Sequence, residues 1–266
     1  MEKYPKIDST VVISDIRNFT HLFEVFQKND NDDFLRFMEE YYSLGLKLAG
    51  LVSEDKSFYI TTAGDGILVF FFEEHHERRA YLYSLLLYQL TEKACSAFNR
   101  KHGCEVSFGI GLETGYVQKV SSTVGSEKIE TYLGSVINIA ARIEGTTKNF
   151  NRTKLIIGEK VYRRLVQNLF EEEYKHLVEK SSSLRQEYDE VIEHHNEMNK
   201  LNQDLMLFYI FEHNLKGVDL PLPLFRLSPT LADMDKTSFF DVIKKLAVSR
   251  ENYKSILYFL EEISAD

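Results

Sequence analysis

The chain has 266 residues, of which 32 are Lys or Arg and 41 are Asp or Glu, so its formal net charge is −9. Hydrophobic residues make up 44% of the chain and charged residues 27%, which are ordinary values for a globular protein and exclude a largely disordered one. Apolar runs stop well short of the ~20 residues that cross a bilayer, so the sequence predicts no membrane-spanning helix.

The N-terminal segment, MEKYPKIDST, lacks the basic stretch and apolar core of a secretory signal. The two cysteines, Cys95 and Cys104, are too few for a disulfide framework, and their spacing matches no zinc site. These features predict a cytoplasmic protein. Because the chain is acidic and its cations are scattered, we expect no nucleic-acid partner.

Strands and helices are intermixed along the chain. The predicted strands are residues 10–14, 58–60, 67–72, 106–112, 116–120 and 154–157, and the predicted helices are about 16–51, 80–100, 136–145 and 159–167. Hairpins are expected around Gly64-Asp65-Gly66 and around Glu113-Thr114-Gly115, because such glycines favour tight turns. The pattern predicts an α+β fold with a mostly antiparallel sheet flanked by helices.

Two segments differ from this pattern. Residues 170–206 contain no Gly or Pro and carry apolar residues at an interval of seven, which predicts a helical insertion. Either one long helix or a hairpin broken at residues 181–183 is compatible with it. Residues 235–263 predict two amphipathic helices, the second capped by Ser249, that dock on the rest of the protein.

Two isolated acids end apolar strands. Asp15 follows the first strand and precedes a helix, and Asp65 lies at the tip of a hairpin. Taken singly, Asp15 is explained as a helix N-cap and Asp65 as a turn residue. Brought side by side, the two carboxylates would hold two Mg²⁺ ions, which serve the attacking and leaving oxygens of phosphoryl transfer. The N–H groups that begin the following helix suit a phosphate.

A third segment of interest is the helix that contains Asn138 and Arg142. The two residues are four positions apart, so they share one face of the helix. A lone pair of this kind is explained as an exposed Arg and an incidental Asn. Together with the two acids, the amide and the guanidinium could hold a ribose and stabilise charge that develops in a transition state.

Four ordered motifs carry a family resemblance: SDIRNFT at 14–20, AGDGILVFF at 63–71, FGIGLETGYV at 108–117 and YLGSVINIAARIEGTTK at 132–148. With them the sequence resembles the class III nucleotidyl cyclase catalytic domain, the fold of adenylate and guanylate cyclases, which has a ferredoxin-like core. A fifth segment, Leu215-Lys216-Gly217-Val218, is similar to the family's late phosphate-binding lysine segment. The resemblance covers about residues 8–228, interrupted by the insertion at about 170–207, and leaves 229–266 as a C-terminal helical extension.

The resemblance implies a head-to-tail homodimer with two shared sites that act on a nucleoside triphosphate. Asp15, Asp65 and the Ile16 carbonyl would bind two Mg²⁺ or Mn²⁺, and the N–H groups of Asn18, Phe19 and Thr20 would hold the triphosphate. The other subunit would supply Asn138 for the ribose, Arg142 for the α-phosphate and Lys216 for phosphate oxygens. The metal ions would activate the 3′-hydroxyl for in-line attack, and pyrophosphate would leave.

The residues that select the base depart from the family's pattern. Adenylate cyclases place a Lys three residues before the first Gly of the hairpin motif and guanylate cyclases a Glu, whereas this chain has Thr61. The family's second base-selecting position lies three residues before the Gly that precedes the Asn138 and Arg142 helix, and here it holds Thr131. Both hydroxyls donate and accept hydrogen bonds, so neither provides the usual purine selection. Tyr59 either fills the space of a purine's second ring or is an ordinary core residue of its strand.

This departure favours a pyrimidine cyclase that makes cyclic UMP or cyclic CMP, similar to the stand-alone cyclases of bacterial Pycsar antiphage defence. The lack of a recognisable sensor domain agrees with that assignment. One alternative is an adenylate cyclase with a non-standard pocket, and another is a catalytically inactive cyclase-like binding domain. A palm-type polymerase or diguanylate cyclase is disfavoured, because its hairpin would carry a GG[DE]EF-like motif.

Overall fold

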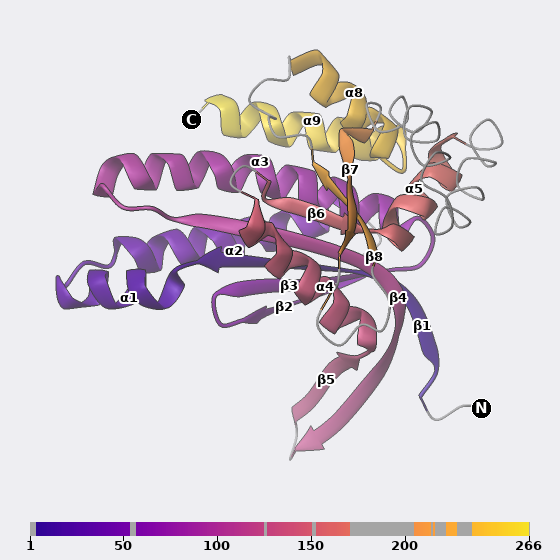
Figure 1. Cartoon of the computed structure of the whole chain (residues 1–266), viewed down its shortest axis with the longest axis horizontal. Coiled ribbons are helices and arrows are strands. Elements are labelled where there is room, and N and C mark those ends of the chain that lie inside the picture. Colours follow the sequence, from indigo (N-terminus) through magenta and orange to yellow (C-terminus); the bar gives the residue numbers. More distant parts are fainter. Residues whose placement is uncertain are drawn as a thin grey trace.

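In the computed structural model an eight-stranded sheet runs through the protein (Figure 1). The structure describes residues 4–53, 57–124, 127–150, 153–170, 205–213, 215, 222–227 and 236–265. The strand order is β2-β3-β1-β4-β6-β8-β7, and β5 pairs with the far end of β4. Among the described strands, β4 and β6 pair in parallel and the other pairs are antiparallel. The predicted α+β class with a mostly antiparallel sheet is confirmed.

The elements have the following bounds. The strands are β1 (Lys6–Arg17), β2 (Phe58–Ala63), β3 (Gly66–Phe72), β4 (Ser107–Val124), β5 (Glu127–Leu133), β6 (Leu155–Gly158), β7 (Leu207–His213) and β8 (Leu222–Leu227). The helices are α1 (Phe19–Lys28), α2 (Asp33–Val52), α3 (His76–His102), α4 (Ser135–Thr146), α5 (Glu159–Phe170), α8 (Lys236–Leu246) and α9 (Arg250–Ala265), with a 3₁₀ turn at Thr147–Asn149 after α4.

The two faces of the sheet are covered differently. Helices α1, α2 and α3, with α8 and α9 outside them, lie on one face, and the main core between them includes Leu48, Val69 and Leu85. Helix α4 lies on the other face, where Val136 packs with Phe70 in a smaller core (Figure 1). Residues of β3 alternate between the two cores. The sequences of the central strands are therefore continuously apolar, because both faces of these strands are buried.

The second predicted hairpin, around Glu113-Thr114-Gly115, is wrong. These residues lie inside β4, one strand of 18 residues. The buried Glu113 carboxylate accepts a hydrogen bond of 2.7 Å from the Thr114 N–H. A Cβ atom on Gly115 would lie 3.1 Å from Cβ of Val136. The glycine therefore serves the close approach of α4 to the sheet and makes no turn.

The first predicted hairpin is confirmed, with the turn one residue earlier than the Asp-Gly pair suggested. Gly64 has the positive φ of 65°, while Gly66 already belongs to β3. The single helix predicted over 16–51 is wrong, because β1 continues to Arg17 and the helical part is divided between α1 and α2. The N-cap of α1 is Asn18, so Asp15 is a strand residue and not a helix cap.

The two C-terminal helices pack on the rest of the protein. Ile243 of α8 and Ile256 of α9 belong to the main core. The N–H of Asn252 donates a hydrogen bond of 2.9 Å to the Ser249 hydroxyl, which confirms the predicted cap. The predicted insertion at 170–207 lies outside the described residues except at its ends. Within the described ranges, no helix is both long enough and apolar enough to span a bilayer.

Candidate active site

Two carboxylates meet at the ends of neighbouring strands. Asp15 near the end of β1 pairs in register with Gly66 of β3, and Asp65 lies in the turn just before that glycine. The Ile16 N–H donates a hydrogen bond of 3.2 Å to the Asp65 carbonyl oxygen. Burial, together with the neighbouring charge of Asp65, raises the pKa of Asp15. The structure thus brings together the two acids that the sequence singled out.

The space beside Asp15 is free of side chains from the adjacent strands. Its register partners are Gly66 on β3 and Gly109 on β4, so neither strand places a Cβ next to the carboxylate. Among the described residues, no group of three or more His, Cys, Asp or Glu side chains could hold a metal ion. A donor set of two carboxylates and backbone oxygen nevertheless fits Mg²⁺, which keeps several waters and takes substrate phosphates as ligands.

The start of α1 lies directly after this strand end. Asn18 has left-handed backbone angles (φ 59°), and no side chain caps the first turn of the helix. The Phe19 ring anchors this turn by stacking on Phe23, with ring centroids 5.8 Å apart. Thr20 is exposed. The Asn18 side chain therefore does not cap the helix, and the first N–H groups of a helix suit an anion.

Tyrosines of α2 support the two strand ends from the main-core side. The Tyr41 hydroxyl donates a hydrogen bond of 2.6 Å to Oγ of Ser14, the residue before Asp15. The Tyr42 hydroxyl donates to the carbonyl oxygen of Gly64, the residue before Asp65. Burial raises the pKa of both tyrosines, so they remain protonated donors. Each acid is thus preceded by a residue that α2 holds in place.

Helix α4 carries Asn138 and Arg142 outside its buried stripe. Asn138 is exposed and Arg142 is half-buried, whereas Val136, Ala140 and Ile143 are buried against the sheet. The charged groups with the largest effects on the pKa of Asp15 are Asp65, Arg17 and Lys148, behind the effect of burial.

Arg17 and Lys148 are cations beside Asp15 to which the sequence analysis gave no role. Both act to lower the pKa of Asp15, against the larger effects of burial and of Asp65. Arg17 could have been found from strand alternation, because residues two apart on a strand point to the same face. Lys148 ends the fourth motif, but only the packing of α4 on the sheet brings it to Asp15.

The residues expected to read the base come together only in part. Alternation along β2 places Thr61 on the same face as Tyr59, which packs in the smaller core. The Tyr59 hydroxyl donates to the Glu130 carbonyl oxygen at 3.1 Å, and its ring lies 5.1 Å from that of Tyr132. Thr131 is exposed, and alternation directs it to the face of β5 opposite Tyr132. Lys216 lies outside the described residues.

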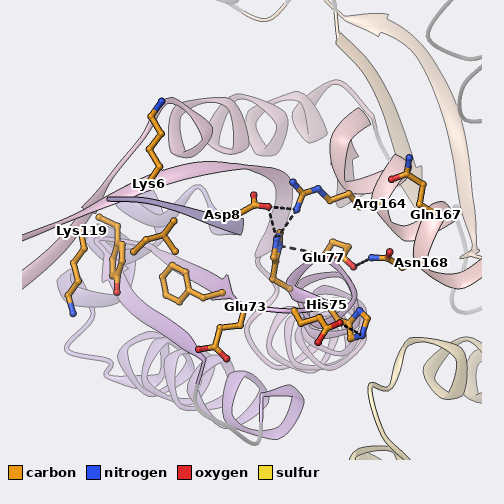
Figure 2. Close-up of a pocket in the computed structure, with 14 residues that line it drawn as sticks. Lys6, Asp8, Glu73, His75, Glu77, Lys119, Arg164, Gln167 and Asn168 are labelled. Atoms are coloured by element: carbon orange, nitrogen blue, oxygen red, sulfur yellow. Dashed lines mark hydrogen bonds and ion pairs between the residues drawn. The ribbon is translucent and has the colours of Figure 1, made fainter. Parts of the chain in front are cut away.

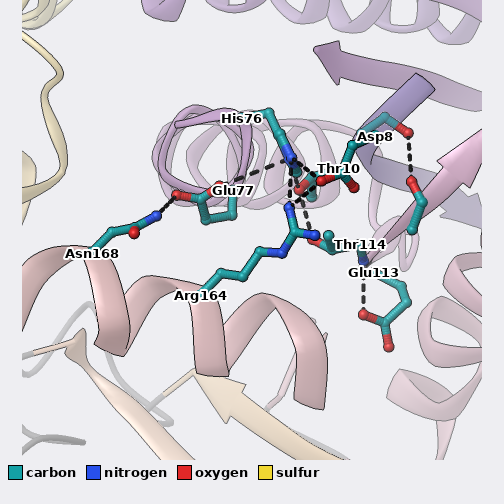
Figure 3. Close-up of polar contacts among 10 residues, drawn as sticks. Asp8, Thr10, His76, Glu77, Glu113, Thr114, Arg164 and Asn168 are labelled. Atoms are coloured by element: carbon teal, nitrogen blue, oxygen red, sulfur yellow. Dashed lines mark hydrogen bonds and ion pairs between the residues drawn. The ribbon is translucent and has the colours of Figure 1, made fainter. Parts of the chain in front are cut away.

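The pocket shown in Figure 2 is remote from these residues. It has a volume of about 970 Å³ and lies at the other end of β1, with Lys6, Asp8 and Arg164 among its lining residues. None of the predicted site residues lines it. Figure 3 shows the polar contacts beside it, in which Arg164 donates to Asp8 at 2.7 Å and to His76 at 2.9 Å. These contacts join β1, α3 and α5.

Comparisons with known proteins agree with the geometry. The sequence model described as "Adenylate and Guanylate cyclase catalytic domain" matches residues 1–195. An adenylate cyclase of Anabaena cylindrica is 28% identical over 166 residues, which are 59% of this chain and 30% of that protein, so the chain spans less than a third of this curated relative.

Solved structures share the fold at low sequence identity. The adenylyl cyclase CyaB from P. aeruginosa has a TM-score of 0.58 at 15% identity, covering 88% of this chain and 100% of that one. The guanylyl cyclase Cya2 has a TM-score of 0.56 at 15% identity, covering 87% and 97%. Because the family match extends over more than half of the chain, the protein belongs to the adenylate and guanylate cyclase catalytic domain family.

Proposed function

We propose that the protein is a metal-dependent nucleotidyl cyclase that converts a nucleoside triphosphate into a 3′,5′-cyclic nucleotide and pyrophosphate. The observation that carries the proposal is the pairing of Asp15 with Asp65 at two adjacent strand ends. Neighbouring carboxylates repel each other, and a divalent cation removes that repulsion. Membership of the cyclase family supports the same chemistry.

Each side chain then has a defined task. Asp15, Asp65 and the Ile16 carbonyl would hold two Mg²⁺ or Mn²⁺ ions, which when bound supply Lewis-acid activation of the 3′-hydroxyl and neutralise the triphosphate. The N–H groups of Asn18, Phe19 and Thr20 would bind phosphate oxygens at the positive end of α1. Tyr41 and Tyr42 hold the two strand ends in place from the side of the main core.

The second half of each site is proposed to come from the partner subunit of a homodimer. It would supply Asn138 to orient the ribose, Arg142 to stabilise charge at the α-phosphate, and Lys216 to bind phosphate oxygens. One observation supports this: the face that carries Asp15 keeps a band of half-buried apolar residues. The band comprises Ile13, Tyr59, Leu68, Phe72, Tyr132 and Ile137. Apolar patches of this kind mark protein interfaces.

For the base, we propose a pyrimidine, so that UTP or CTP would give cyclic UMP or cyclic CMP as a second messenger in antiphage defence. Thr61 and Thr131 supply short hydroxyl side chains at the positions that select the base, where a long charged side chain is usual. The Tyr59 ring is held on the Asp15 face by Glu130 and Tyr132, where it would restrict the room for a purine. The Anabaena relative favours the second candidate, an adenylate cyclase that makes cyclic AMP.

Substrate choice is tested by incubating the protein with each of the four ribonucleoside triphosphates and Mn²⁺ and identifying the product by mass spectrometry. We expect cyclic UMP or cyclic CMP as the main product. ATP as the sole good substrate would favour the adenylate cyclase. Absence of any cyclic product, with nucleotide binding that Asp15→Ala leaves unchanged, would favour an inactive binding domain.

The shared site is tested by mixing two inactive variants. Asp15→Ala and Arg142→Ala should each abolish turnover and keep the fold. In a mixed dimer, one site combines Asp65 and the intact Asp15 of one chain with the intact Arg142 of the other. Random mixing at equal amounts should restore about a quarter of the wild-type turnover, because half of the dimers are mixed and each has one working site of two. No recovery on mixing would contradict the shared geometry.

A further inference from the structure

A buried ion pair joins the end of β1 to helix α4. Nη2 of Arg17 lies 2.5 Å from Oε1 of Glu144, and the two side chains are only 11% and 7% exposed. The same nitrogen donates to the Glu144 carbonyl oxygen at 3.2 Å and to the hydroxyl of Thr147. One guanidinium thus holds both the side chain and the backbone at the C-terminal end of α4.

The sheet leaves room for this pair beside Asp15. Gly109 of β4 is the register partner of Asp15, so the two residues share a position across the strands. A Cβ atom on Gly109 would collide with Arg17, Glu144 and Thr147. The glycine therefore leaves the space next to Asp15 that the ion pair occupies.

Arg17 faces two carboxylates at different distances. Its Nη1 atom is 3.8 Å from Oδ2 of Asp15, whereas its Nη2 atom is 2.5 Å from Glu144. Glu144 is the closer partner and balances the guanidinium charge. Asp15 is therefore left as an acceptor for another cation, although an arginine lies next to it.

Fold stability alone does not account for the pair. Burial raises the pKa of Glu144 to about 7 even with Arg17 beside it, so keeping this carboxylate ionised costs free energy. Buried ion pairs can often be replaced by apolar residues of similar volume without loss of stability. A function that needs both charges next to Asp15 explains their presence better.

We propose that Arg17 and Glu144 are positioning residues that fix the metal-binding strand end and helix α4 to each other within one subunit. Successive helix residues are rotated by about 100°, so Glu144 points toward the sheet while Arg142, two residues earlier, points away from it. Holding Glu144 therefore sets the rotation of α4 and with it the direction of Arg142.

The proposal rests on the proposed function, in which Asp15 serves one site of the dimer and Arg142 of the same chain serves the other. The ion pair then links the two active sites through each subunit. A change at Glu144 should disturb metal binding in one site and the α4 contribution in the other, whereas a purely structural residue would only lower stability.

The first test measures Mn²⁺ binding to the full chain by isothermal titration, without nucleotide. Glu144→Gln leaves the Arg17 charge unbalanced beside Asp15, and a repulsion of about 1 kcal/mol should weaken Mn²⁺ binding about fivefold. The double variant Arg17→Gln with Glu144→Gln removes the repulsion but also the contact that fixes the strand end, so its Mn²⁺ binding should stay weaker than that of the wild type. Full recovery to the wild-type affinity would show a charge effect without a positioning role. Glu92→Gln is the matched control, because Glu92 pairs with Lys154 elsewhere in the protein.

The second test places Glu144→Gln in one chain of the mixed dimer made from Asp15→Ala and Arg142→Ala. In the chain with Arg142→Ala, which supplies the working Asp15, it should raise the Mn²⁺ concentration needed for half-maximal turnover. In the chain with Asp15→Ala, which supplies the working Arg142, it should lower kcat at saturating Mn²⁺. Glu92→Gln should do neither.

Several outcomes separate the proposals. If the wild type binds Mn²⁺ and Glu144→Gln binds it equally well, the positioning role is wrong. If the wild type itself binds no Mn²⁺, the proposed function fails and the ion pair is only structural. Should Glu144→Gln not fold, the double variant takes its place in the mixed dimer. A kcat equal to that of the parent mixed dimer, with the double variant in either chain, would then contradict the proposal.

Discussion

The Tyr59 hydroxyl donates a hydrogen bond of 3.1 Å to the backbone oxygen of Glu130, which ties β2 to β5 across the face that carries Asp15. The Tyr59 ring also packs against Phe70 and Tyr132, at centroid distances of 5.9 and 5.1 Å. The Tyr59 ring, two residues before Thr61, is therefore fixed by a hydrogen bond at its hydroxyl and by contacts with two aromatic rings.

Tyr59→Ala should shift the base preference toward purines. Removal of the ring opens space on the strand that carries Thr61, so kcat/KM for ATP relative to UTP should rise about tenfold, a change of about 1.4 kcal/mol. Tyr59→Phe keeps the ring and loses only the hydrogen bond, so the ratio should stay near the wild-type value while stability falls by about 1 kcal/mol. An equal fall in kcat/KM for both nucleotides in Tyr59→Ala would argue against a role in base selection.

Asp65→Asn should stabilise the metal-free protein and abolish its response to metal. Asp65 raises the pKa of Asp15 because the two carboxylates repel each other, so neutralising one of them removes that repulsion. A gain of about 1 kcal/mol corresponds to an increase in Tm of roughly 2–4 °C. Melting curves in EDTA and in Mn²⁺ measure both effects. The control Asp241→Asn, at an exposed position on α8, should melt as the wild type does in each buffer.

If Asp65→Asn melted lower than the wild type in EDTA, the two carboxylates would not be opposing each other in the free protein. If Mn²⁺ still raised its Tm as much as that of the wild type, Asp65 would not take part in metal binding. Either result would weaken the assignment of the two strand ends as one site.

Glu113→Gln should make the protein more stable at alkaline pH. Burial raises the pKa of Glu113 to about 7, against 4.5 for the free side chain, although the N–H groups of Thr114 and Val161 donate to it. For an acid whose pKa is raised in the folded state, the free energy of unfolding is highest below pH 4.5. It falls as the pH rises from 4.5 through 7 and stays low above that. The ionised form therefore costs up to about 3 kcal/mol at pH 8.

Urea unfolding at pH 5 and pH 8 measures this effect. Gln keeps the acceptor oxygen and carries no charge, so the variant should exceed the wild type by about 1–3 kcal/mol at pH 8 and by less than about 1 kcal/mol at pH 5. The comparison with wild type isolates Glu113, because Glu144 is present in both proteins. A variant that is less stable than wild type at both pH values would show that the charge at position 113 is stabilising.

His76 should be neutral, with its proton on Nδ1. The Arg164 guanidinium can only donate, so Nε2 of His76 must accept the 2.9 Å hydrogen bond, and Nδ1–H then donates to Thr10 at 2.7 Å (Figure 3). Burial lowers the pKa of His76 below 6.5. Its contribution to stability is present above pH 6.5 and is lost as the pH falls through the lowered folded-state pKa.

Nitrogen-15 NMR of the histidine side chains checks the tautomer, with His76→Gln to assign the signals. At pH 7.5 we expect a protonated Nδ1 and an unprotonated Nε2 for His76. The free energy of unfolding of the wild type should fall more steeply than that of His76→Gln between pH 7 and pH 5. A proton on Nε2 at pH 7.5 would show that Arg164 does not donate to this ring.

Much of the architecture could be predicted because the signals are local. Apolar runs predicted β1, β3 and β6, helical spacing predicted α3 and α4, and the hairpin of Asp65 follows from the positive φ that Gly64 adopts. Such features depend on neighbouring residues, so one sequence is enough to recognise them.

Contacts between segments far apart in the chain settled the rest. Gly115 looks like a turn residue, yet its small size is needed for α4, which is 20 residues away in sequence. Arg17 and Glu144 are 127 residues apart, and nothing near either residue indicates that they pair. The amino-acid order can name the groups capable of chemistry, but which buried charges balance each other depends on distances that exist only after the chain has folded.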